Sequence, residues 1–119
     1  MSSNKETVNK YIDGFNTNNH SKILACLTDN VIWELPGVYL KTGKEAFDQE
    51  IENELFISPP EITVSRLTES NNVVIAEGRV VTKKKDGEVI KLVFCDVFEM
   101  ENGLISKLTS YLMNIPLSH

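Results

Sequence analysis

Residues 92–100 read LVFCDVFEM, and the carboxylate of Asp96 stands in a run that is otherwise apolar from residue 92 to residue 98. Successive side chains of a β-strand point to opposite faces, and here both sets of positions around Asp96 are apolar. A strand of this kind is normally buried on both faces. An unpaired, ionised carboxylate in such surroundings costs several kcal/mol, so Asp96 needs a partner, a proton or a chemical role.

The rest of the second half of the chain is also strand-like, with turn signals between the strands. The segments are EITVSRLTE (61–69), NVVIAEGRVVTKK (72–84), EVIKLVFCDVFEM (88–100) and LISKLTSYLM (104–113). Their separators are Asn71-Asn72, Asp86-Gly87 and Asn102-Gly103, which are residue pairs that favour the positive φ of tight hairpins. The order predicts an antiparallel meander.

The first half of the chain has helical spacing instead. Apolar residues recur every three or four positions in residues 5–15, 21–27 and 44–55, with Asn19 or Ser21 as the N-cap of the second helix. Residues 31–37, VIWELPG, interrupt this pattern as a strand that ends at a proline and a glycine. The sequence therefore predicts an α+β fold, with three N-terminal helices packed on one side of a curved antiparallel sheet.

Length and composition exclude several classes of protein. The 119 residues predict one domain, residues 1–119, with a net charge of -5 that disfavours nucleic acid as a partner. No apolar stretch approaches the length of a membrane span, and the polar N-terminus lacks the apolar core of a signal peptide, so we expect a cytoplasmic protein. Neither a phosphate loop nor credible metal-ligand spacing is visible, and we expect neither a metal nor another cofactor. Cys26 and Cys95 are expected to be free thiols.

The outer face of the predicted sheet is expected to be covered. Helices on one side leave the other face of the sheet in water, although both faces of residues 92–98 are apolar. A second copy of the chain is the economical cover. We therefore expect a two-fold symmetric homodimer that forms through the outer sheet face.

The turn at Asp86-Gly87 predicts which residues face Asp96. If these two residues form a two-residue turn, Glu77 lies directly opposite Asp96 on the same face, and the pKa of one carboxyl rises unless Arg79 neutralises the pair. A similar count through the preceding turn places Arg66 opposite Glu77. The alternative is that Glu77 and Arg79 lie on the outward face, or form an ordinary ion pair at the sheet edge. From the apolar neighbours at positions 94, 95, 97 and 98 and the expected nearness of Glu77, we predict that Asp96 titrates well above the usual range of an aspartic acid.

Three segments carry a resemblance to a known family: YIDGFNTNNHSKILACLTDNVIWELPG (11–37), KTGKEAF (41–47) and CDVFEMENGLISKLTSYL (95–112). In this order the chain resembles the nuclear transport factor 2-like superfamily, in particular its SnoaL-like and ketosteroid isomerase-like members. The resemblance implies a cone of curved sheet around three helices, with a pocket for a small, mainly apolar molecule. The superfamily includes enzymes, binding proteins and dimerisation modules, so the resemblance implies architecture more firmly than function.

The match to ketosteroid isomerase is partial at the level of single residues. Tyr11 falls where that family has its oxyanion-hole tyrosine, and Asp96 falls where it has a protonated aspartic acid that donates to a ligand oxygen. The general base of the family, however, falls on Leu35, so the resemblance implies poor steroid isomerisation. Limonene epoxide hydrolases resemble the chain at Arg79, but their two catalytic carboxylates fall on apolar residues, Val81 and Met113.

Three functional hypotheses remain open at this point. The first is a cofactor-free enzyme of the isomerase or cyclase type, in which Tyr11 and Asp96 polarise an oxygen and Glu77 accepts the proton. The second is a non-catalytic binding protein for a small apolar or aromatic molecule, and the third is a dimerisation module with a filled cavity. Under the first two, the residues expected to contact the ligand are Phe15, Trp33, Leu35, Arg79, Phe94 and Leu112.

Overall fold

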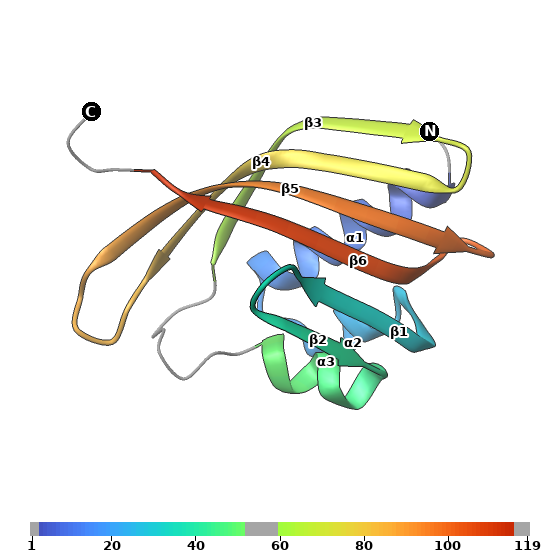
Figure 1. Cartoon of the computed structure of the whole chain (residues 1–119), viewed down its shortest axis with the longest axis horizontal. Coiled ribbons are helices and arrows are strands. Elements are labelled where there is room, and N and C mark those ends of the chain that lie inside the picture. Colours follow the sequence, from blue (N-terminus) through green and yellow to red (C-terminus); the bar gives the residue numbers. More distant parts are fainter. Residues whose placement is uncertain (1–2, 52–59, 116–119) are drawn as a thin grey trace.

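The computed structural model of the chain describes residues 3–51 and 60–115. Three helices and six strands follow one another within these residues (Figure 1). The helices are α1 (Ser3–Asn16), α2 (His20–Leu24) and α3 (Lys44–Ile51). The strands are β1 (Leu27–Leu35), β2 (Tyr39–Thr42), β3 (Glu61–Ser70), β4 (Val73–Lys83), β5 (Val89–Glu101) and β6 (Leu104–Asn114).

The helices follow the periodicity of the sequence. In α1 the apolar stripe that contains Val8, Ile12 and Phe15 is buried, as an amphipathic helix requires. Helix α2 begins after Asn19, whose side chain accepts a hydrogen bond from the Lys22 backbone N–H, so Asn19 is the N-cap. This helix is shorter than predicted because the chain enters β1 at once. The predicted third helix extends to residue 55, but residues 52–55 lie outside the described residues.

The strands form one six-stranded sheet in the order β2-β1-β6-β5-β4-β3. The predicted α+β fold is confirmed, and all three helices lie on one side of the curved sheet (Figure 1). Two features go beyond the predicted meander. Strand β1 pairs with β6 in parallel, which makes the sheet mixed, and the short strand β2 was not predicted. The pairing of β1 with β6 joins segments that are distant in sequence, and such contacts leave no periodic signal in either one. Strand β2 is only four residues long and pairs with its neighbour β1.

The register between β4 and β5 corrects the predicted pairing of Asp96. The Lys84 N–H donates to the Glu88 carbonyl at 2.9 Å, and the Gly87 N–H donates to the Lys84 carbonyl at the same distance. The loop therefore contains residues 85–87, three residues rather than two, and Gly87 takes the positive φ that such loops require. One extra residue moves every later side chain to the other face. Asp96 lies opposite Ala76, and its predicted pairing with Glu77 is wrong.

Glu77 and Arg79 lie on the convex face of the sheet, away from the helices. Glu77 pairs across strands with Cys95 on one side and, as predicted, with Arg66 on the other. The Arg66 guanidinium donates to both oxygens of Glu77, at 2.6 and 3.0 Å, and this hydrogen bonding lowers the pKa of Glu77. Arg79 is exposed and lies opposite Val93. The alternative interpretation, in which Glu77 and Arg79 lie on the outward face, is therefore the correct one, and the ion pair that Glu77 forms is with Arg66.

The hydrophobic core lies between the three helices and the concave face of the sheet. Its largest fully buried side chains are Phe47 on α3 and Phe98 on β5, and Tyr11 of α1 contacts both rings edge-on. Within residues 3–51 and 60–115, no helix is long and apolar enough to cross a membrane. The same residues contain no cluster of side chains suited to hold a metal ion. Cys26 and Cys95 are free thiols.

Candidate functional site

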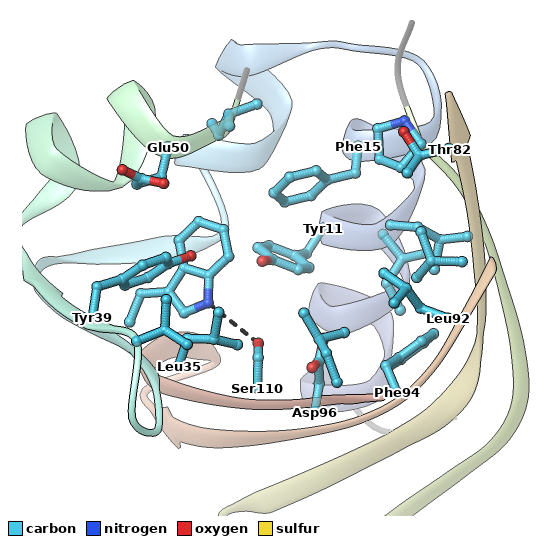
Figure 2. A pocket seen from close by; sticks show the side chains of 18 of the residues that line it. Tyr11, Phe15, Leu35, Tyr39, Glu50, Thr82, Leu92, Phe94, Asp96 and Ser110 are labelled. Atoms are coloured by element: carbon cyan, nitrogen blue, oxygen red, sulfur yellow. Dashed lines mark hydrogen bonds between the residues drawn. The ribbon is translucent and has the colours of Figure 1, made fainter. Parts of the chain in front are cut away.

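A cavity of about 500 Å³ opens between the concave face of the sheet and the helices. Its walls are mostly aromatic and aliphatic, and Figure 2 shows α1 forming one side and the strands forming the floor. The aromatic lining residues are Tyr11, Phe15, Trp33, Tyr39 and Phe94. The polar lining residues are Asn18, Glu50, Thr82, Asp96 and Ser110. A volume of this size, with few polar groups, is typical of small-molecule sites.

Trp33 organises the aromatic wall. Its ring stacks on Phe47 with centroids 4.4 Å apart, and it meets Phe15 and Tyr39 edge-on at 6.3 and 5.7 Å. Phe47 does not line the cavity itself, so it supports the wall from behind. Offset-stacked and edge-to-face contacts are the favoured geometries of aromatic pairs. Packing between the rings therefore holds the aromatic wall in one arrangement.

Asp96 lies half-buried on the floor of the cavity. Its Oδ1 atom is buried and has no hydrogen-bond partner among the described residues. Burial raises the pKa of Asp96 to about 7, and hydrogen bonding by Ser110, its neighbour on β6, limits the rise. The prediction of a raised pKa is confirmed, although burial causes the rise and Glu77 contributes nothing to it. At neutral pH the side chain is thus close to its midpoint between acid and carboxylate.

Ser110 connects Asp96 to Trp33. The indole Nε1–H of Trp33 donates to Ser110 Oγ at 3.2 Å (Figure 2). An indole nitrogen only donates, so the hydroxyl oxygen of Ser110 must be the acceptor in this bond. The single hydrogen of Ser110 is then free to point at the carboxyl of Asp96 across the strand pair. Sequence analysis did not single out Ser110, although it lies on the same face of its strand as Leu112, which was expected in the pocket.

Two phenols, those of Tyr11 and Tyr39, and the carboxylate of Glu50 also line the cavity. Burial, followed by the charge of Asp96, raises the pKa of Tyr11 well above its usual range. Burial also raises the pKa of Tyr39, with further contributions from Glu50 and Asp96. Both phenols are therefore neutral donors at physiological pH, and Figure 2 shows them extending into the cavity from opposite sides. Glu50 forms an ion pair with Lys41, at 3.5 Å between Oε1 and Nζ.

Most residues expected at the site are brought together in this cavity. The lining includes Tyr11, Phe15, Trp33, Leu35, Phe94, Asp96 and Leu112. Glu77 and Arg79 do not line it, because the three-residue loop turns their side chains to the convex face. Sequence reasoning missed Tyr39, Glu50 and Thr82, and neither Tyr39 nor Glu50 stood in a pattern that could have revealed it. The roles assigned to the lining residues stay predictions.

Comparison with known proteins places the chain in a family. Residues 8–108 match the model of the SnoaL-like domain. The chain belongs to the SnoaL-like domain family. No curated protein is similar to this SnoaL-like domain in sequence at a significant level. The match of residues 8–108 confirms the expected resemblance to SnoaL-like members of the nuclear transport factor 2-like group.

Solved structures share the fold of this SnoaL-like domain at low sequence identity. An NTF2-like protein of unknown function from Burkholderia pseudomallei K96243 is 22% identical, with a TM-score of 0.85 over 95% of this chain and 92% of its own. An LEH-like epoxide hydrolase of M. tuberculosis is 16% identical, with a TM-score of 0.83 over 93% of this chain and 83% of its own. TerC, co-crystallised with polyporic acid, is 18% identical, with a TM-score of 0.83 over 92% and 90%. At these identities the likeness establishes the fold alone.

Proposed function

We propose that this SnoaL-like protein binds a small, mainly apolar or aromatic molecule in its cavity and orients it through Asp96 and Tyr11. The observation that carries the proposal is the buried, unpartnered Oδ1 of Asp96 on the floor of an aromatic cavity. Buried polar atoms without partners are rare in native proteins, and a ligand oxygen would satisfy this one. Co-crystallisation of the structural neighbour TerC with polyporic acid supports the proposal by analogy.

A phenolic probe such as 2-naphthol tests this function. Asp96→Ala is expected to weaken binding of the probe by about 1–3 kcal/mol, because the hydrogen bond at the cavity floor is lost. Isothermal titration calorimetry at pH 6, where most Asp96 is protonated, gives the dissociation constants. The control is Asp29→Ala, since the Asp29 side chain is 95% exposed and lies outside the cavity. Equal binding by the Asp96→Ala variant and the unmodified protein would make Asp96 a structural residue.

Proton-transfer chemistry of the isomerase or cyclase type is a second candidate function. Its support is the pKa of Asp96, because an acid–base residue works best when its pKa is near the operating pH. Glu77 is no longer a candidate base, and Leu35 cannot accept a proton. Glu50 is the other carboxyl group among the described lining residues. A non-catalytic binding or dimerisation module remains the alternative, and it would use the same donors for orientation only.

We also propose that a second copy of the chain covers the convex face of the sheet. Tyr111 and Met113 alternate with cavity-lining residues of β6, so they point to the convex face, where they are 53% and 68% exposed. Val93 and Val97 of β5, which are partly exposed, lie between these residues and β4 on the same face. Exposed apolar side chains gathered on one face of a sheet are typical of an interface. A two-fold axis would place the same residues of both copies against each other.

The oligomeric state in solution tests this interface. Light scattering at micromolar concentration is expected to give twice the chain mass. Met113→Asp is expected to shift the protein to monomer, because it would bury an unpaired charge in both halves of the interface. Val38→Asp is the matched control, since Val38 is 70% exposed but lies at the cavity and not on the convex face. A monomer mass for the unmodified protein would refute the interface.

A further inference from the structure

The charged side chains among the described lining residues of the cavity are all of one sign. Two carboxyl groups, those of Asp96 and Glu50, line it, and the described lining residues include no lysine, arginine or histidine. Figure 2 shows the two groups at separate places, with Asp96 on the floor strands and Glu50 on helix α3. Tyr11 and Tyr39 contribute neutral phenols between them. These described lining residues therefore offer hydrogen-bond donors but no positive charge to a bound molecule.

A cation pairs with Glu50 from outside the cavity lining. Lys41 holds its ammonium 3.5 Å from Glu50 Oε1 and 5.6 Å from the ring centroid of Tyr39. Lys41 itself does not line the cavity. An anion in the cavity would thus contact Glu50, which lines it, rather than Lys41, which does not. One oxygen of Glu50, by contrast, can accept a hydrogen bond from a ligand donor while the other pairs with Lys41.

We propose that the cavity rejects anions and takes a ligand without negative charge, whose aromatic body lies against Trp33 and whose hydroxyl or ammonium group donates to Glu50. This inference rests on the proposed binding function and narrows it to a chemical class. A carboxylate in the cavity would lose its hydration and gain no cation in exchange. An ammonium would instead gain the carboxylate of Glu50 and the faces of the aromatic wall.

Three probes with one skeleton isolate the effect of charge. They are 2-naphthoate, 2-naphthylmethanol and 2-naphthylmethylammonium, which differ only in the group on one carbon. In calorimetry at pH 8 we expect the alcohol and the ammonium each to bind at least about tenfold more tightly than the carboxylate, a ratio that corresponds to about 1.4 kcal/mol. At pH 6 the difference in affinity between the carboxylate and the alcohol should be smaller, because Asp96 is then mostly neutral.

Glu50→Gln assigns the discrimination to one residue. The variant keeps the shape of the side chain and removes its charge, so we expect the ammonium probe to bind several-fold more weakly and the carboxylate probe several-fold more tightly. Glu45→Gln is the matched control, because Glu45 is exposed on the same helix and does not line the cavity. It should change neither affinity by more than about twofold.

The outcomes separate this inference from the function on which it rests. If the alcohol binds and the carboxylate binds equally well, the cavity does not select by charge and the inference is refuted, while the binding function stands. If the unmodified protein selects by charge and the Glu50→Gln variant selects equally well, Glu50 does not accept the hydrogen bond from the ligand. The inference is then also refuted. If none of the three probes binds, the proposed function and the inference fall together.

Discussion

The Asp96→Asn variant is expected to be more stable than the unmodified protein at pH 8, by up to about 4 kcal/mol in the free energy of unfolding. Burial raises the pKa of Asp96 from 3.8 to about 7, so the folded protein prefers the neutral acid. At pH 8 folding must bury a carboxylate instead. Asparagine has nearly the same shape and carries no charge at any of these pH values, so the variant avoids this cost.

The sign of the pH dependence follows from proton binding. Between the unfolded pKa near 3.8 and the folded pKa near 7, the folded chain binds more protons than the unfolded chain at this position. Stability contributed by neutral Asp96 is therefore fully present below pH 3.8, declines as the pH rises through this window, and is gone above the folded pKa. Carboxylates such as Glu77, whose pKa is lowered by Arg66, act in the opposite direction and affect both proteins equally.

Urea unfolding of both proteins at several pH values between 4 and 9 measures the difference. The gap between the variant and the unmodified protein should be smallest at pH 4 and should widen up to about pH 8. Glu99→Gln is the matched control, because Glu99 is an exposed carboxylate on the same strand. A gap that stays constant over the whole range would mean that Asp96 titrates normally, and the account of a buried, nearly neutral acid would be wrong.

Phe47→Ala is expected to lower the free energy of unfolding by about 3–5 kcal/mol. Phe47 is 0% exposed and sits behind the cavity wall, stacked on Trp33 at 4.4 Å and edge-on to Tyr11 at 6.1 Å. Removing its ring loses buried apolar contact and leaves a hole that the rigid aromatic neighbours cannot fill. Trp33 would also lose its stacking partner, so binding of 2-naphthol should weaken as well.

Denaturant unfolding followed by the fluorescence of Trp33 measures both the stability and the local packing. Phe47→Leu provides a graded comparison, because it keeps most of the buried apolar volume and should cost less than alanine. This second variant also preserves the test if the alanine variant fails to fold. Val38→Ala, at a side chain that is 70% exposed, should change stability by less than about 0.5 kcal/mol. A cost below about 1 kcal/mol for Phe47→Ala would contradict a supporting role behind the wall.

Local patterns in the sequence were enough to predict the helices and to single out Asp96 as an unusual carboxyl group. The apolar stripe of α1 depends only on residues within a few turns of one another, and the N-cap at Asn19 depends on a neighbour three positions away. The prediction that Asp96 titrates high rested on its immediate apolar neighbours and on the expected nearness of Glu77. The raised pKa agrees with the first reason, while the second was wrong. These features were predictable because the interactions that produce them lie within short stretches of chain.

The partners of Asp96 were decided only by the tertiary structure. Asp86 and Gly87 suit both a two-residue and a three-residue hairpin loop, and the choice, which depends on the hydrogen bonds between Lys84 and Glu88, sends Glu77 to the convex face. The cavity also needs Tyr39 and Glu50, which the pairing of β1 with the distant strand β6 carries to its edge. No periodicity records such long-range contacts, because each side chain's environment is created by a segment remote in sequence.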